Sequence, residues 1–182
     1  RGLGDVYKRQ NIVSVVASSS STGFQIYASS NYGIGVRSNS ANIIGTNVTA
    51  APTANTWYHV ALVRRSGTLT LYVNGSSVGS TSTAYTFSDT QFNAGNTPIG
   101  QYANAYISNI RYVVGTAVYT SNFTPPTSPL TAIANTQLLL NGTNAGIYDQ
   151  TAKNDLITVG SAQISTAQSK FGGSSIYFTT TG

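Results

Sequence analysis

The sequence lacks several residue types on which protein chemistry depends. It contains no cysteine and one histidine, His59, so it can form no disulfide or thiolate site and has too few nitrogen ligands for a transition metal. Glutamate is also absent, and the four acidic residues are all aspartates. No apolar run approaches the roughly 20 residues of a transmembrane helix. With no methionine, the chain is expected to be an internal piece of a longer protein.

Charge is scarce, because only 7% of the residues are charged, against about a quarter in ordinary soluble proteins. The run Asp5–Gln10 resembles a translated adapter from DNA library preparation, so we treat residues 1–10 as a non-native segment. That segment holds three of the nine basic and one of the four acidic residues, which leaves a net charge of +3 rather than +5.

The remaining basic residues do not form the dense stripe that nucleic-acid binding requires. They are scattered along the chain: Arg37, Arg64, Arg65, Arg111, Lys153 and Lys170. The sequence therefore predicts no nucleic-acid partner and no membrane partner.

What the chain has in abundance is Ser, Thr, Asn and Gly, together with Val, Ile and Tyr. The first group disfavours helices, and the second suits a pleated sheet. Asn74-Gly75 between two β-like runs predicts a two-residue type I′ hairpin turn. We expect an all-β antiparallel sandwich with short strands: Ile12–Val16, Phe24–Ala28, Gly33–Arg37, Ile43-Ile44, Trp57–Val63, Leu69–Val73, Ser76–Ser80, Pro98–Gly100, Tyr106–Val114, Gln137–Leu140, Leu156–Val159 and Ser174–Phe178.

Two segments carry a family resemblance. Trp57–Arg64, which reads Trp-Tyr-His-Val-Ala-Leu-Val-Arg, and Leu69–Gly75, which ends Val-Asn-Gly, are similar to the central hairpin of laminin-G-like domains in the concanavalin A-like lectin/glucanase superfamily. Ile99-Gly100 followed by Tyr106–Tyr112 resembles the late strands of that family. The resemblance implies a concanavalin A-like jelly roll. Ser108 and Asn109 stand where the family often has carboxylates, so it implies no ion site there.

The resemblance also predicts how the chain is divided. Residues 115–130 look like the tail of such domains in bacteriophage structural proteins and marine environmental sequences, whereas Leu138–Gly142 and Lys170–Phe178 resemble the opening of another one. We therefore expect a jelly roll over residues 11–130 that lacks its opening strands. Residues 131–182 would begin a following repeat, and either fold back to complete the same sandwich or remain an incomplete tail.

Catalysis is not expected. Glycoside hydrolysis needs two carboxyl groups about 5–10 Å apart, but Asp89 lies alone and Asp149 and Asp155 share one loop. His59 beside Trp57 is interpreted as a packed residue, because no carboxylate is placed to orient it. Asp149, Asn154 and Asp155 form the one candidate calcium cluster. An ordinary loop rich in Asp and Asn explains them better, and no cofactor is predicted.

Ligand binding by aromatic and amide side chains remains. Tyrosine rings stack on sugar faces, and amides and arginines bind hydroxyl groups. The candidate residues are Tyr32, Arg37, Gln101, Tyr102, Asn104 and Arg111. Alternatively, the tyrosines only cover a sheet face. We expect a non-catalytic module that binds a glycan or another protein, in a tandem-repeat polypeptide on a virion or extracellular surface. The alternative is a purely structural or interaction domain of such an array.

Overall fold

The computed structural model describes residues 9–17, 23–38, 41–45, 49–82, 87–97 and 100–179. Residues 1–8 of the segment interpreted as non-native and Pro98-Ile99 of one expected strand lie outside this part. Within it every regular element is a β-strand, which confirms the all-β prediction, and no helix is long and apolar enough to cross a membrane. The strands are β1 (Gln10–Val15), β2 (Phe24–Ser29), β3 (Gly33–Ser38), β4 (Ala41–Ile44), β5 (Val60–Arg65), β6 (Thr68–Val73), β7 (Ser76–Ser82), β8 (Phe92–Ala94), β9 (Ala105–Ile107), β10 (Asn109–Val113), β11 (Thr136–Asn141), β12 (Gln163–Ser165) and β13 (Ser175–Phe178).

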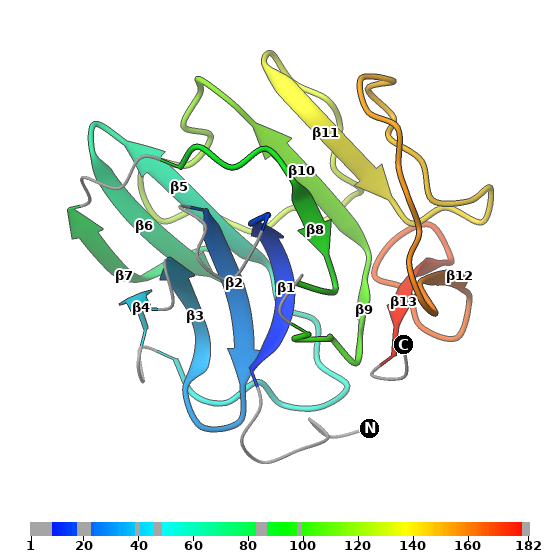
Figure 1. Cartoon of the computed structure of the whole chain (residues 1–182), viewed down its shortest axis with the longest axis horizontal. Helices are drawn as coiled ribbons and strands as arrows, with labels where there is room; N and C mark the ends of the chain where they lie inside the picture. The colour runs from blue at the N-terminus through cyan, green and yellow to red at the C-terminus, as the bar shows by residue number, and fades with distance from the viewer. Residues whose placement is uncertain are drawn as a thin grey trace. The chain divides into compact units, whose positions relative to one another are not determined.

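The chain divides into two compact units. Unit 1 comprises Arg1–Ala103 and Tyr119–Pro125, and unit 2 comprises Asn104–Val118 and Pro126–Gly182. Unit 1 contains a five-stranded sheet in the order β4-β3-β2-β1-β8 and a three-stranded sheet in the order β5-β6-β7 (Figure 1). All the strand pairs in these sheets are antiparallel.

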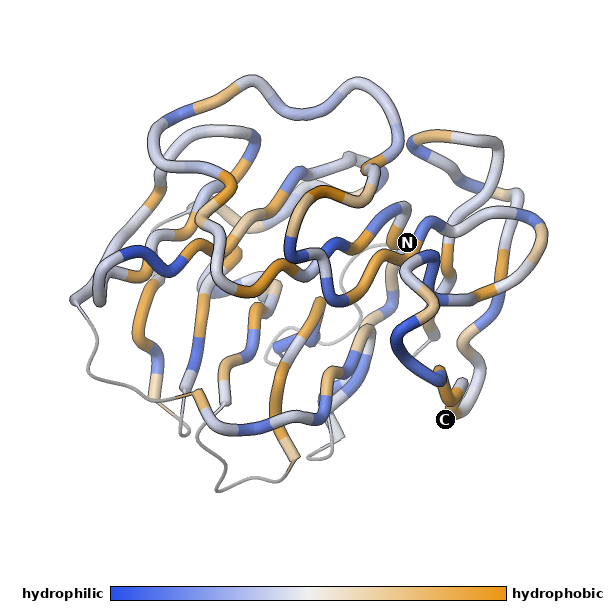
Figure 2. Tube along the Cα trace, turned by 90° about the horizontal axis from the view of Figure 1, so that it is seen from above, coloured by the Kyte–Doolittle hydropathy of each residue, from blue (hydrophilic) through white to orange (hydrophobic). Residues whose placement is uncertain are grey.

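The two sheets of unit 1 enclose one hydrophobic core. Apolar residues alternate with polar ones along the strands (Figure 2), and each sheet has apolar residues that are buried or packed against the core. The five-stranded sheet contributes Ile26, Val36 and Ile44 to this core, and β6 contributes Leu69 and Leu71. Face-to-face packing of two antiparallel sheets confirms the expected β-sandwich.

The central hairpin forms where the sequence predicts it. Asn74 and Gly75 link β6 to β7 with φ angles of 51° and 82°, both positive, as a type I′ turn requires. The backbone N–H of Asn74 donates to the carbonyl of His59 at 2.8 Å. The expected strand at Trp57–Val63 starts later, at Val60.

Residues 119–125 lie on the surface of unit 1 without forming a strand. The Phe123 ring stacks on Tyr119 with centroids 3.5 Å apart, and the His59 ring meets both rings edge-on. The N–H of Phe123 donates to the carbonyl of Gly75 at 2.9 Å. His59 is therefore a packing residue at this docked segment.

Unit 2 contains a three-stranded sheet in the order β12-β13-β9 and the pair β10-β11. The expected single strand at Tyr106–Val114 is wrong. It is two strands with different partners, because β9 pairs with β13 and β10 with β11. The break falls at Ser108, whose carbonyl accepts from the N–H of Gly142 at 2.9 Å.

The expected strand at Leu156–Val159 is also wrong. These residues form no strand, and Ile157 and Val159 are 88% and 69% exposed. The segment is rich in β-branched residues, but a strand also needs a partner with which to share its backbone hydrogen bonds. The short strands β8 and β12, three residues each, were not expected.

Candidate functional site

The face of the five-stranded sheet that points away from the core of unit 1 is polar. Residues directly opposite each other in an antiparallel pair share a face, and Tyr27 lies opposite Asn11, Ser14 opposite Gln25, and Gln25 opposite Arg37. The same registers extend the row to both edges of the sheet. We call this set the polar face: Asn11, Ser14, Gln25, Tyr27, Arg37, Asn42 and Asn93.

Much of the polar face is buried, because Gln25 is 5% exposed and Tyr27 is inaccessible. Segments distant in sequence supply hydrogen-bond partners. The side-chain amide of Gln25 donates to the Gln101 side chain, and the Tyr27 hydroxyl donates to the carbonyl of Gly45 at 2.9 Å.

Gly35 makes room for this arrangement. A Cβ atom at Gly35 would lie 2.6 Å from the hydroxyl oxygen of Tyr27 and 2.8 Å from the carbonyl oxygen of Gly45. A larger residue would therefore prevent the phenol from crossing β3 to reach Gly45. The repeated glycines at positions 33 and 35 are the sequence signal for this close approach.

Four of the six predicted ligand residues lie at or beside the polar face. Arg37 belongs to it, Gln101 is hydrogen-bonded to it, Tyr102 follows Gln101 and is 41% exposed, and Tyr32 lies in the turn between β2 and β3. Three buried residues of the polar face were not predicted from the sequence: Asn11, Gln25 and Tyr27. Asn11 is fully buried and donates its side-chain amide to the carbonyl of Asn96.

The other two predicted residues belong to unit 2. Asn104 directly precedes β9. Arg111 lies on β10. Its Nη1–H group donates a hydrogen bond to the carbonyl of Thr131 at 3.0 Å, which links the loop at Thr131 to the strand.

Arginine side chains dominate the electrostatics of the polar face. Burial, followed by the neighbouring Arg9 guanidinium, lowers the pKa of Arg37, while burial raises the pKa of Tyr27. The Arg9 guanidinium lies 4.8 Å from the centroid of the Tyr32 ring and 5.3 Å from that of Tyr27. Arg9 belongs to the segment interpreted as non-native and is therefore not counted among the residues of the site.

The carboxylate of Asp149, at the centre of the candidate calcium cluster, is occupied by hydrogen bonds from its own loop and from β11. Asp149 is 7% exposed and accepts hydrogen bonds from the N–H groups of Leu139 (3.0 Å), Thr151 (3.0 Å) and Lys153 (3.3 Å). The hydroxyl of Thr151 and the side-chain amide of Asn154 also donate to it, each at 2.7 Å. Both carboxylate oxygens therefore act as hydrogen-bond acceptors that fasten the loop to β11.

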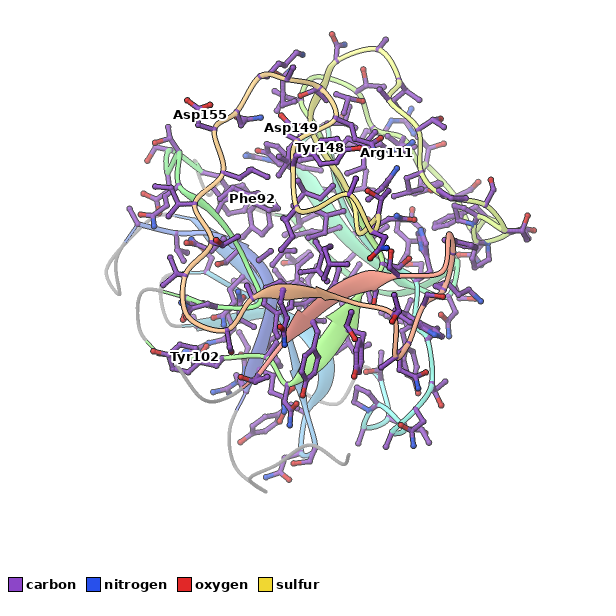
Figure 3. All side chains as sticks on the ribbon, turned by 90° about the vertical axis from the view of Figure 1, so that its right-hand side faces the viewer. Phe92, Tyr102, Arg111, Tyr148, Asp149 and Asp155 are labelled. Atoms are coloured by element: carbon purple, nitrogen blue, oxygen red, sulfur yellow. The ribbon has the colours of Figure 1, made fainter. Side chains whose placement is uncertain are left out.

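The pKa of Asp149 follows from this environment. Burial alone would raise it, but the hydrogen bonds from Thr151, Leu139 and Asn154 outweigh burial and hold it well below its usual value. Asp155 is exposed and lies apart from Asp149 (Figure 3). In the part of the chain that the structure describes, no three His, Cys, Asp or Glu side chains gather as metal ligands would.

The third described aspartate is also remote from these two in the chain. Asp89 belongs to unit 1, where its Oδ2 accepts from the N–H of Ala17 at 3.4 Å beyond the end of β1. Asp149 and Asp155 belong to unit 2, so no two described carboxylates face each other within one unit. Among the residues that the structure describes, neither unit presents the carboxylate pair that glycoside hydrolysis uses.

Comparison with known proteins gives one match. A family model described as the concanavalin A-like lectin/glucanases superfamily matches residues 4–116, which is more than half of the chain. No curated protein and no solved structure matches the chain.

Proposed function

Because the chain belongs to the concanavalin A-like lectin/glucanases superfamily, we propose that unit 1 is a non-catalytic module that binds carbohydrate at its polar face. The observation that carries the proposal is the gathering of Tyr32, Arg37, Gln101 and Tyr102 around this face. Amide and guanidinium groups bind the hydroxyls of a sugar, and a tyrosine ring stacks on its apolar face.

The supporting residues pre-organise the site. Gln25 holds Gln101 through its side-chain amide, and Tyr27 is fixed by Gly45. A side chain that is already ordered loses less conformational entropy when a ligand binds. Arg37 and Tyr102 thus lie at or beside a face whose buried part is hydrogen-bonded.

The proposed binding requires no calcium and no other cofactor. The site contains no carboxylate, whereas calcium prefers clustered oxygen ligands that include carboxylates. We place the module in a larger phage or extracellular surface protein, which is consistent with the resemblance of residues 115–130 to phage structural proteins.

A glycan array probed with the full chain tests this function. We expect binding to at least one glycan, equal in calcium and in a chelator, and no release of reducing sugar. Tyr102→Ala and Arg37→Ala should each weaken binding about tenfold, a loss of roughly 1.4 kcal/mol. Tyr148→Ala is the matched control, because Tyr148 is similarly exposed (45% against 41%) but lies in unit 2.

Two outcomes would count against the proposal. One is a blank array with calcium present. The other is equal weakening by Tyr102→Ala and Tyr148→Ala, which would place the ligand elsewhere. Removal of residues 1–9 should not weaken binding, because the proposed site does not use Arg9.

A second candidate function is an interaction domain within a repeat array. Ile157 and Val159 favour it, since both are more than two-thirds exposed on an extended segment. A chain that binds no glycan but self-associates in sedimentation, and becomes monomeric on Ile157→Ser, would support this function instead.

A further inference from the structure

A row of three side chains crosses the β12-β13-β9 sheet of unit 2 on one face. Gln163 lies opposite Tyr177, and Tyr177 lies opposite Tyr106. The other face carries the row Ile164, Ile176 and Ile107 in the same registers. Ile176 is 2% exposed, so the isoleucine face packs inward and the Gln-Tyr-Tyr row is the outer face.

The two tyrosines form a stacked pair. Their ring centroids are 4.6 Å apart and their planes differ by 22°, which is close to the strand spacing of about 4.8 Å. Each ring therefore turns one face to the other ring, and both residues are half-buried. The second face of Tyr177 is on the side of β12, where Gln163 is exposed.

Two neutral hydrogen-bonding groups lie beside this row among the described residues. Next along the same face, the hydroxyls of Ser161 and Thr179 are hydrogen-bonded to each other. None of the three residues in the row carries a charge at neutral pH. An aromatic face beside an exposed amide and two hydroxyls, without charge, matches the chemistry of an uncharged sugar ring, which presents C–H groups on one side and hydroxyls at its edge.

We propose that the Gln163-Tyr177-Tyr106 row of unit 2 is a second binding site, specific for a neutral sugar ring, separate from the polar face of unit 1. The sugar stacks on the face of the Tyr177 ring that is turned away from Tyr106, and the Gln163 amide binds its hydroxyls. The inference rests on the proposed carbohydrate-binding function but not on its site. Two sites on one chain would raise the avidity for a polysaccharide that reaches both.

The test is a nitrogen–proton NMR titration of the full chain with neutral hexasaccharides of glucose, mannose, galactose and xylose. We expect shifts of the Gln163 and Tyr177 amides with at least one of these sugars. Tyr177→Ala should abolish these shifts, whereas Tyr177→Phe should retain them because the ring face remains. Gln163→Ala, at an exposed position, should weaken binding at least threefold, and Tyr148→Ala should change nothing.

The outcomes separate the two sites. Shifts at β12 and β13 that survive Tyr102→Ala support the second site, whether or not the polar face responds. Shifts confined to residues 25–37 and 100–102 overturn the second site and leave the proposed function standing. No shift with any of the sugars, or unchanged affinity in both Tyr177→Ala and Gln163→Ala, also overturns it. Circular dichroism melting of each variant separates lost binding from lost folding.

Discussion

At the scale of single residues, the carboxylate of Asp149 holds a loop of unit 2 against β11. This carboxylate accepts hydrogen bonds from Leu139 on β11 and from residues 151–154. Hydrogen bonds to a charged acceptor are stronger than neutral ones, and a buried donor left without a partner is costly. The loop therefore depends on the ionised form of one side chain.

We expect Asp149→Asn to lower the free energy of unfolding by roughly 3 kcal/mol at pH 7, because an amide cannot accept all these bonds and turns an N–H toward donors. Asp155→Asn, at an exposed position in the same loop, should change it by less than about 0.5 kcal/mol. Urea denaturation measures both. Equal effects of the two substitutions would contradict the role assigned to Asp149.

The same residue sets a pH dependence. The pKa of Asp149 is lower in the folded chain than the ordinary value near 4, so its contribution is complete above that value and is lost as the pH falls toward the folded pKa. Between about pH 5 and pH 2, the wild-type chain should lose more stability than Asp149→Asn. Parallel losses in the two chains would show that other groups control the acid transition.

At the scale of elements, the Asn74-Gly75 turn supports the segment 119–125 as well as its own hairpin. A Cβ atom at Gly75 would lie 1.8 Å from the carbonyl oxygen of Phe123, whereas one at Gly67 would meet nothing within 4 Å. Both glycines have positive φ, 82° and 76°. The pair therefore separates backbone strain, which the two share, from the close approach of the docked segment.

We expect Gly67→Ala to cost about 1 kcal/mol through strain alone, and Gly75→Ala to cost at least about 1 kcal/mol more, because Phe123 must move away. Thermal melting gives the two losses. Fluorescence anisotropy or amide exchange of residues 119–125 should change only in the Gly75 variant. Equal melting losses would mean that the segment is not held at this turn.

Elements defined by local sequence could be predicted, and those defined by distant partners could not. The Asn74-Gly75 turn is encoded in two residues with positive φ, and β6 in the alternation of Leu69 and Leu71. In contrast, the burial of Gln25 depends on Gln101, which is 76 positions away. Leu156–Val159 has the composition of a strand, but no neighbouring strand supplies a partner.

The candidate site shows the same limit. Tyr102 and Gln101 could be selected from the sequence alone, because an aromatic ring next to an amide is a combination of residue types that suits a sugar ligand. The pairing of Tyr106 with Tyr177 was not recognisable, since the two lie in segments separated by the long connection between β10 and β11. Registers between distant strands are set by packing, and no local pattern reports them.

At the scale of the whole molecule, the pairing of residues 131–182 with earlier strands is the feature with most consequence. β11 pairs with β10, and β13 lies between β12 and β9. These ladders give the C-terminal third partners from residues 104–118 within unit 2. The prediction that this third replaces lost opening strands requires at least this pairing.

Amide hydrogen exchange can test the pairing directly in the full chain. We expect slow exchange at Leu139 and Ile176, which lie in ladders and are 2% exposed. Exchange should be fast at Ile157 and Val159, which are exposed and outside any ladder. The fast-exchanging and slow-exchanging amides are compared within one chain, so the comparison needs no second protein as a control. Fast exchange throughout 156–178 would mean that this segment is an open tail, and a fold-back that completes a sandwich would then be excluded.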